Sequence, residues 1–228
     1  MFGRKPKKTF EVMVQTGDNV PSVEFSTRFK TVICDCPWRY QNWTNAANGA
    51  AVSAMSTMSK EEIIALKSTV SAITDKDCVM LFWTTWPKLE EAYEVVKEWG
   101  FQVISACPWI KTTPNTGQIS TGIGFWFQST SEILLVVRKG KPTSARDPAV
   151  LGLLCGSERQ FYAKKNKHSQ KPKDMHEYAE MKLEGPYLEL FAREKRDNWA
   201  CIGYDLGYAI TPQGIKRVET QAKEPVSI

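Results

Sequence analysis

The chain has few of the residues that build metal sites and disulfide frameworks. It contains two histidines, His168 and His176, and its six cysteines are scattered rather than paired at zinc-ligand spacing. Several cysteines, such as Cys78, lie inside apolar runs, which is typical of reduced, buried thiols. We therefore expect neither a metal ion nor a disulfide scaffold.

Long apolar runs are also missing. No run approaches the roughly 20 residues that a membrane-spanning helix needs, and no apolar segment follows the basic start of the chain as in a signal peptide. With 228 residues and 42% apolar content, the chain can bury a sizeable core, most simply as one α/β domain. These features predict a cytoplasmic protein without membrane contact.

Several common catalytic and nucleotide-binding motifs are absent. We find no Walker lysine motif and no serine-centred nucleophile elbow, and a Cys–His catalytic pair has a choice of two histidines. Gly122 and Gly124 resemble part of a phosphate cradle but lack the full glycine fingerprint and its strand–turn–helix context. Dinucleotide binding is therefore weakly supported.

The charge of the chain is mildly basic, with a net charge of +5 and a pI of about 8.8. Basic residues cluster in 4–8, 138–141 and 164–173. Such clusters can neutralise phosphates, but many lysine-rich stretches are merely solvated surfaces. Charge alone leaves a nucleic-acid partner open.

Apolar runs of strand length alternate with helical patterns, which predicts βαβ units and a largely parallel sheet. The expected strands cover 31–34, 78–83, 101–104 with 109–111, 132–137 and 187–192. The expected helices begin at Ser59, where Glu62 completes a capping box, and cover 88–99 and 174–183. We divide the chain into a polar, partly ordered lead-in (1–30), one domain (31–208) and a flexible tail (209–228).

The segment from Asp35 to Trp38, with the sequence Asp-Cys-Pro-Trp, follows the first apolar strand. An acidic side chain at the carboxyl end of a buried strand is well placed for chemistry, because ligands of open α/β sheets bind there. Pro37 stiffens the turn, and Trp38 offers a flat ring for stacking. The alternative interpretation is a structural turn that caps the strand.

Two basic residues further along the chain lie at the ends of predicted elements: Lys171 before a helix and Arg193 after a strand. Lys171 precedes Pro172 and a helix, where it can receive a carboxylate or phosphate, although a solvated lysine fits equally well. Arg193 follows the strand over 187–192 and can point into the same cleft as Asp35, or form a surface ion pair with a neighbouring glutamate.

Taken in order, these segments resemble the MT-A70 family of S-adenosylmethionine-dependent adenine-N6 methyltransferases. The resemblance covers about residues 31–206. Its pieces are Asp35–Trp38, Thr57–Ser59, Leu81–Thr85, Trp99–Phe101, Trp109–Lys111, Gly122–Trp126, Glu132–Val136, Arg138–Pro142, His168–Pro172 and Leu188–Arg193. The chain's length resembles the phage or prokaryotic branch, whose setting is a bacterial or phage-infected cell.

The resemblance implies a Rossmann-like methyltransferase fold in which the catalytic motif precedes the main cofactor-binding segment. S-adenosylmethionine is the implied cofactor. Lys171 would pair with its methionine carboxylate, with Ser169 close by, and Arg193 and Arg196 would lie near its ribose. The pair Tyr204-Asp205 would contact its adenine, although family members often carry Asn-Glu or Asn-Gln there.

The implied chemistry centres on Asp35 and the backbone carbonyl of Cys36, which would accept the two hydrogens of the substrate amino group. Trp38 would stack on the base, and Tyr40 would assist. The loops over 41–57 and 112–124 would close over the substrate. Phosphate contacts are expected from Lys111, Lys139 and Lys141. Family members carry proline where this chain has Cys36, so the restriction on the φ angle is lost while the carbonyl remains.

We therefore expect a methyltransferase that modifies the N6 atom of adenine in DNA, with nucleic acid as its partner. RNA is the alternative substrate, because no recognition module in the sequence separates the two. A second alternative is a non-catalytic nucleic-acid-binding subunit of the same fold. Against that alternative, both Asp35 and Trp38 are present.

Overall fold

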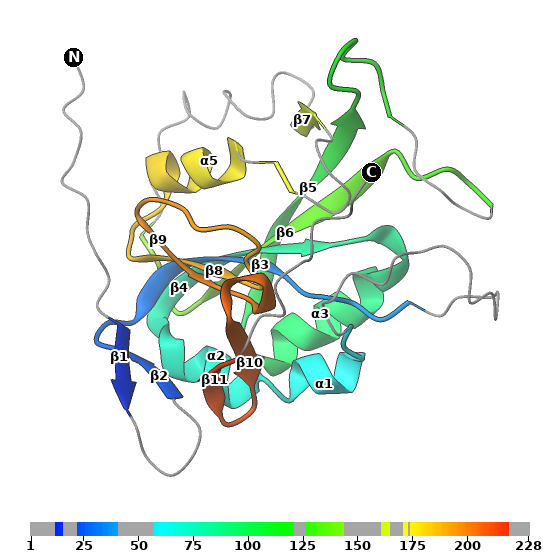
Figure 1. Cartoon of the computed structure of the whole chain (residues 1–228). Helices are drawn as coiled ribbons and strands as arrows, with labels where there is room; N and C mark the ends of the chain where they lie inside the picture. The colour runs from blue at the N-terminus through cyan, green and yellow to red at the C-terminus, as the bar shows by residue number, and fades with distance from the viewer. Residues whose placement is uncertain are drawn as a thin grey trace, which may run out of the picture.

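A seven-stranded sheet forms the centre of the protein (Figure 1). The computed structural model describes residues 12–15, 22–40, 57–120, 126–143, 161–164, 171–172 and 174–218. The strand order is β7-β5-β6-β4-β3-β8-β9. The strands are β3 (Phe29–Asp35), β4 (Thr74–Thr84), β5 (Gln102–Thr112), β6 (Ser131–Lys139), β7 (Phe161–Lys164), β8 (Tyr187–Leu190) and β9 (Trp199–Ile202).

Most neighbouring strands of this sheet are parallel. β3 runs parallel to β4 and β8, β8 to β9, and β5 to β7. β6 is antiparallel to both of its neighbours, β4 and β5. The predicted α/β fold with a largely parallel sheet is confirmed, and the carboxyl ends of β3, β4, β5 and β8 meet at one edge of the sheet.

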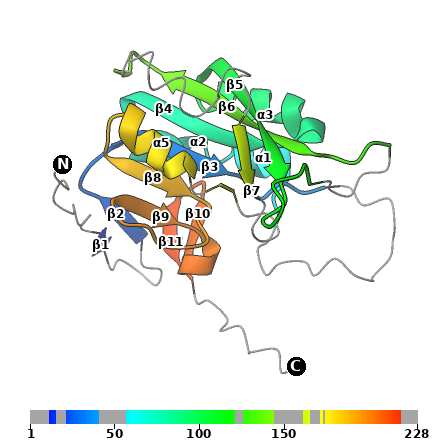
Figure 2. The ribbon, with the colours of Figure 1, turned by 90° about the horizontal axis from the view of Figure 1, so that it is seen from above.

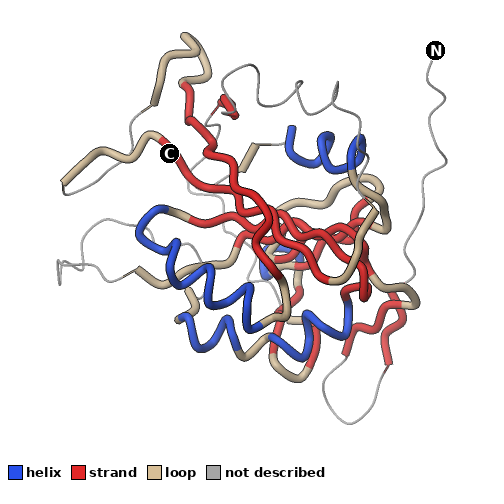
Figure 3. The backbone as a smooth tube through the Cα atoms, turned by 180° about the vertical axis from the view of Figure 1, so that it is seen from behind, coloured by secondary structure: helices blue, strands red, loops and turns tan. Residues whose placement is uncertain are grey.

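Helices cover both faces of the sheet, as Figure 3 shows from behind. On one face lie α1 (Lys60–Ile64), α2 (Lys67–Ile73) and α3 (Leu89–Glu98), the last preceded by the 3-10 turn η1 (Trp86–Lys88). The other face carries α5 (Asp174–Lys182). Each helix buries apolar side chains in the clusters on the two faces of the sheet, such as Ile63 of α1, Val70 of α2, Val95 of α3 and Ala179 of α5.

The two faces bury separate apolar clusters because side chains alternate along each strand. Val32, Cys34 and Phe82 point to the cluster beneath α1–α3. Ile33, Leu81, Trp83, Trp109 and Leu134 point to the cluster beneath α5. Residues two apart on a strand therefore point to the same cluster, and neighbouring residues point to opposite clusters.

The helix at Ser59 begins as predicted. The Glu62 amide donates to the Ser59 hydroxyl at 3.3 Å, and the Ser59 amide donates to the Glu62 carboxylate at 2.7 Å, which completes the capping box. Gly100 follows α3 with a positive φ of 83°, as expected for the residue that ends a helix.

Residues 208–217 form a hairpin, so the prediction of a flexible tail from residue 209 is wrong for this segment. β10 (Tyr208–Thr211) and β11 (Gly214–Arg217) pair with each other, and β11 pairs with β2 (Ser22–Phe25). β1 (Val12–Gln15) completes this sheet, which lies beside the β8–β9 edge of the large sheet (Figure 2). Burial of Ile210 and Ile215 in the core stabilises the hairpin.

The expected lead-in is partly ordered, since β1 and β2 lie within residues 1–30, and β3 begins at Phe29, two residues before the predicted domain start. Residues 219–228 of the expected tail lie outside the described residues. Among the described helices, none combines the length and apolar character needed to cross a membrane. The cytoplasmic location stays a prediction.

Candidate functional site

Four charged side chains gather where the strands beneath α5 end. Asp35 lies two residues beyond buried Ile33 on β3, and Glu132 lies two residues before Leu134 on antiparallel β6. Lys111 lies two residues beyond Trp109 on β5. Because the side-chain period of a strand is two residues, all three project from the α5 face at the same end of the sheet.

Lys171, just before α5, joins these charges. Its ammonium Nζ lies 2.8 Å from Oδ2 of Asp35 and 3.1 Å from Oε2 of Glu132. The Lys111 ammonium lies 2.7 Å from Oε1 of Glu132, so two carboxylates and two ammonium groups alternate. The Lys171 ammonium also lies 5.9 Å from the centre of the ring of Trp83, which belongs to the cluster beneath α5.

Burial acts on these groups in different ways. Burial raises the pKa of Asp35 above its usual value, although Lys171 opposes the shift. Burial also pushes the pKa of Glu132 upward, but Lys171 and Lys111 together hold the pKa of Glu132 below its usual value. Burial alone would lower the pKa of Lys171, yet the two carboxylates raise that pKa and keep the ammonium charged. Glu132 and Lys171 therefore form an ionised pair, and the Asp35 carboxylate beside them binds a proton more readily than an exposed aspartate does.

Backbone hydrogen bonds hold the turn after Asp35. The Trp38 amide donates to the Cys36 carbonyl at 2.9 Å, and the Met58 amide donates to the Pro37 carbonyl at 2.7 Å. The Arg39 amide in turn donates to the Met58 carbonyl at 2.8 Å. These bonds fix the Cys36 carbonyl although the family's proline is missing, and a carbonyl oxygen has a second lone pair for another donor.

The Cys36 thiol itself is part of the core. Its Sγ lies 3.6 Å from Sγ of Cys34, and both side chains are buried beneath α1–α3. Burial, with smaller contributions from Cys34 and the charge of Asp35, raises the pKa of Cys36 well above its usual value. Because the thiolate is the nucleophile of cysteine chemistry, a thiol held protonated in this way is unreactive. Cys78, expected to be a buried thiol, is buried as predicted.

Trp38 does not offer the stacking face that the sequence predicted. Its side chain is 5% exposed, and its ring packs edge-on against Phe82 with 6.3 Å between ring centres. Trp38 pairs with Met58 in an isolated bridge, and its indole lies in the core beneath α1–α3. Trp38 therefore supports the turn from inside.

Tyr40 lies at the rim of the same site. Its ring is 46% exposed, and its hydroxyl lies 2.8 Å from Oγ1 of Thr85, the residue that follows β4. Partial burial raises the pKa of Tyr40, and the charges of Glu132, Lys171 and Asp35 all act on it. Tyr40 is thus the predicted aromatic residue that the structure leaves accessible beside Asp35.

A second group follows the ends of β8 and β9. Arg193 lies close enough to oppose the rise in the pKa of Asp35. Arg196 approaches Glu189 of β8, with Nε 3.5 Å from Oε2, and Glu189 in turn lies 2.8 Å from Nε2 of buried His176. Glu189 is paired with Ile33 on β3, so its carboxylate lies on the same face as Asp35.

Tyr204 and Asp205 form the short 3-10 turn η2 (Tyr204–Leu206) directly after β9. Gly203 brings this turn against the end of β8, because a side chain at Gly203 would meet the Ala192 carbonyl at 2.0 Å. The structure therefore brings Arg193 and the Tyr204–Asp205 turn to neighbouring strand ends.

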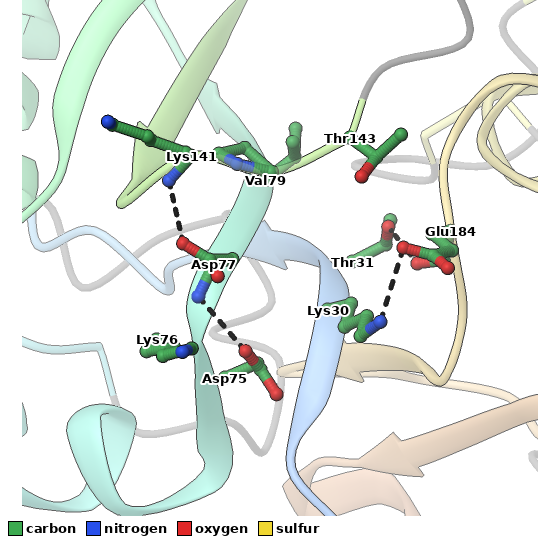
Figure 4. A pocket seen from close by; sticks show the side chains of 10 residues that line it. Lys30, Thr31, Asp75, Lys76, Asp77, Val79, Lys141, Thr143 and Glu184 are labelled. Atoms are coloured by element: carbon green, nitrogen blue, oxygen red, sulfur yellow. Dashed lines mark hydrogen bonds and ion pairs between the residues drawn. The ribbon is translucent and has the colours of Figure 1, made fainter.

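Lys139 and Lys141 lie at the other end of the sheet, which corrects the prediction that they lie near Asp35. β6 runs antiparallel to β4, so Lys139 pairs with Cys78 at the start of β4, whereas Asp35 pairs with Trp83 near its end. Lys141 donates its backbone amide to Asp77 at 2.7 Å and lines a hollow with Thr31 (Figure 4).

Some predicted site features lie outside the described residues. They are Ser169 with the rest of His168–Gln170, the pair Gly122 and Gly124, and residues 41–56 of the first loop. Of the second loop, residues 113–120 are described, and Ile119 forms a bridge with Thr112.

Two carboxylates of the site were not predicted. Glu132 directly precedes the apolar run 133–137 of β6, and Glu189 interrupts β8, Tyr187–Leu190. A carboxylate next to or within a buried apolar run is the sequence signal that could have found both, since buried carboxylates are rare unless they are paired.

The chain is similar in sequence to three proteins named as methyltransferases. The chain is 29% identical over 183 residues to an N(6)-adenosine-methyltransferase MT-A70-like protein of Drosophila melanogaster, covering 78% of this chain and 27% of that protein. It is also 29% identical over 150 residues to the Type II methyltransferase M.MunI of a Mycoplasma species, covering 64% of this chain and 59% of that protein.

A third relative, a putative N(6)-adenosine-methyltransferase MT-A70-like protein of Medicago truncatula, is 28% identical over 167 residues, which are 70% of this chain and 25% of that protein. The chain thus spans between about a quarter and three fifths of the length of these curated relatives. The MT-A70 family model matches residues 29–205, from the first residue of β3 to the turn after β9. This match includes every described part of the charged site, and the chain belongs to the MT-A70 family.

Proposed function

We propose that this protein transfers a methyl group from S-adenosylmethionine to the N6 atom of adenine in DNA. The observation that carries the proposal is Asp35 at the end of β3, followed by a hydrogen-bonded turn and paired with Lys171. Asp35 and the turn offer hydrogen-bond acceptors for the amino group of adenine. Lys171 offers a positive charge for the carboxylate of the cofactor.

The amino nitrogen of adenine is a weak nucleophile because its lone pair is delocalised into the ring. Asp35 and the Cys36 carbonyl would accept its two hydrogens and favour a pyramidal nitrogen whose lone pair is free to attack. The raised pKa of Asp35 makes its carboxylate a better acceptor for the proton that the nitrogen must lose. Each fixed hydrogen-bonding group of this kind lowers the free energy of the transition state by about 3 kcal/mol.

S-adenosylmethionine supplies an electrophilic methyl group on a sulfonium. The residues present fit its three parts: Lys171 would hold its carboxylate, Arg193 and Arg196 would lie along its ribose, and Asp205 would accept from its adenine amino group. Asp35, Lys171 and Glu132 already place both signs of charge together, which matches a zwitterionic amino-acid end. Tyr204 takes the place of the family's asparagine beside Asp205.

DNA is proposed ahead of RNA as the substrate. Among the three relatives described above, the matched segment is 59% of the protein named Type II methyltransferase. It is 27% and 25% of the two proteins named N(6)-adenosine-methyltransferase. RNA is kept as the second candidate because two of these three names specify adenosine.

Mass spectrometry of nucleosides from cells that express the protein tests the proposal. Cells with wild-type protein should contain N6-methyladenine above the background of cells with Asp35→Ala, and separate digestion of DNA and RNA identifies the substrate. Equal levels for both proteins in DNA and in RNA would reject methyltransferase activity. Methylation confined to RNA would replace DNA as the substrate.

A non-catalytic subunit of the same fold would bind nucleic acid without binding the methyl donor. Calorimetric titration of the purified protein with S-adenosylmethionine separates the two possibilities. We expect saturable binding that Lys171→Met weakens at least tenfold. Nucleic-acid binding with no heat of cofactor binding would favour the non-catalytic role.

A further inference from the structure

Two aromatic rings at the rim of the site are anchored at their polar ends and remain partly exposed, although the Lys88 ammonium lies over the Tyr40 ring at 5.6 Å from its centre. The Tyr40 hydroxyl lies 2.8 Å from Oγ1 of Thr85, and the indole Nε1 of Trp86 donates to Oγ of Ser131 at 2.9 Å. Their side chains nevertheless remain 46% and 53% exposed. Each ring is therefore held in a defined orientation without being part of the core.

Trp86 lies next to the charged site although no functional prediction included it. It follows Thr85 directly after β4, whose Trp83 pairs with Asp35. Its hydrogen-bond partner, Ser131, precedes Glu132 in the chain. The indole thus links the residues after β4 to the first residue of β6, at the same end of the sheet as the carboxylates.

Trp86 differs from the tryptophans that the sheet and its helices bury, whereas Trp126, outside these elements, is 94% exposed. Three other tryptophans of the sheet and its helices, Trp83, Trp99 and Trp109, are at most 2% exposed. Burial of an aromatic side chain is a large stabilising contribution, which Trp86 gives up by half. An anchored indole with an open face at a binding site is typical of a platform on which a nucleobase stacks.

We propose that Trp86 is a stacking platform for a base next to the target adenine, while the Tyr40 ring faces the target base itself. The proposal deepens the function above and depends on it. It replaces the platform that Trp38 cannot provide, because that ring is buried. Stacking on Trp86 requires unstacked bases, so it favours single-stranded substrate or a duplex opened around the target.

Binding of a fluorescent single-stranded oligonucleotide with one adenine, measured by anisotropy in DNA and RNA versions, tests this proposal. Trp86→Ala should weaken binding about five- to hundredfold, the range for loss of one base–aromatic stack. Trp86→Phe, which keeps a ring, should recover most of the affinity. Tyr93→Ala is the matched control, because Tyr93 is 46% exposed on α3 and should not affect binding.

Abasic probes identify the partner of Trp86. Replacing one flanking nucleotide by an abasic spacer should weaken binding to wild type as much as Trp86→Ala does, and should add little further loss in that variant. The KM for S-adenosylmethionine should not change. This signature separates stacking from a general loss of structure, which would weaken binding to every probe alike.

The outcomes also separate this inference from the proposed function. If wild-type protein methylates adenine but Trp86→Ala binds every probe as tightly, the inference is wrong and the function stands. Equal sensitivity of Trp86→Ala to all abasic positions would likewise overturn it. If wild-type protein neither binds nor methylates any probe, both are overturned.

Discussion

The ammonium of Lys171 lies 2.8 Å from a carboxylate oxygen of Asp35, although 136 residues separate them in the sequence. The same ammonium lies 3.1 Å from Glu132, so one cation serves two carboxylates at the edge of the sheet. The stability of the site therefore depends on the charges of these three side chains. Measuring both activity and unfolding of their variants separates catalytic effects from structural ones.

Asp35→Asn should abolish activity without destabilising the protein. The pKa of Asp35 is raised, so its ionised form opposes folding above that pKa, and an amide removes this cost. We expect methyl transfer to fall at least about a hundredfold, with an unfolding temperature at pH 7 equal to or above wild type. Asp75→Asn, at the start of β4, is the control and should keep activity. A large loss of stability in Asp35→Asn would contradict the proposed balance of charges.

Lys171→Met should destabilise the protein strongly. It leaves Asp35 and Glu132 facing each other without their shared cation, and breaking such a buried pair costs about 3–5 kcal/mol. Urea unfolding measures the loss. Adding Glu132→Gln to Lys171→Met should restore part of it, since the double variant removes the repulsion. A double variant that is less stable than the single one would show that repulsion is not the cause.

Glu132 should give stability a dependence on acidic pH. Its pKa is below its ordinary value of 4.5 in the folded protein, so its contribution is complete above pH 4.5 and disappears as the pH falls through the lowered pKa. The deficit of Glu132→Gln, measured by urea unfolding, should be constant from pH 7 to pH 5 and shrink below pH 4.5. A deficit that grows on acidification would have the wrong sign.

His176 should influence cofactor binding through Glu189. The Nε2 atom of buried His176 lies 2.8 Å from the Glu189 carboxylate, which also holds Arg196. In His176→Phe the Glu189 carboxylate loses its 2.8 Å partner, while Arg196 keeps its 2.7 Å ion pair with Glu194. We expect the Kd of S-adenosylmethionine to rise about fivefold, the effect of one hydrogen bond of about 1 kcal/mol. His176→Gln keeps a donor and should lie close to wild type. Calorimetry measures both, and equal affinities for wild type and His176→Phe would remove Glu189 from the cofactor site.

Local patterns in the sequence predicted much of the fold. The capping box of Ser59 and Glu62, the glycine that ends α3 and the apolar run of β3 each depend on residues close in sequence. The hairpin at 208–217 was missed because its strands are four residues long and gain their stability from distant partners such as β2. Short strands carry too little local signal to be separated from irregular chain.

The candidate site divides in the same way. By itself the sequence determined that an acid–turn–aromatic motif follows the first buried strand, in family order with Lys171 and Arg193. Only the tertiary structure decided that Trp38 points into the core, that Lys139 lies at the far end of antiparallel β6, and that Glu132 shares Lys171 with Asp35. The reason is physical: residue type and spacing fix which groups are present, whereas strand direction, register and the choice of buried face depend on contacts between segments far apart in the chain.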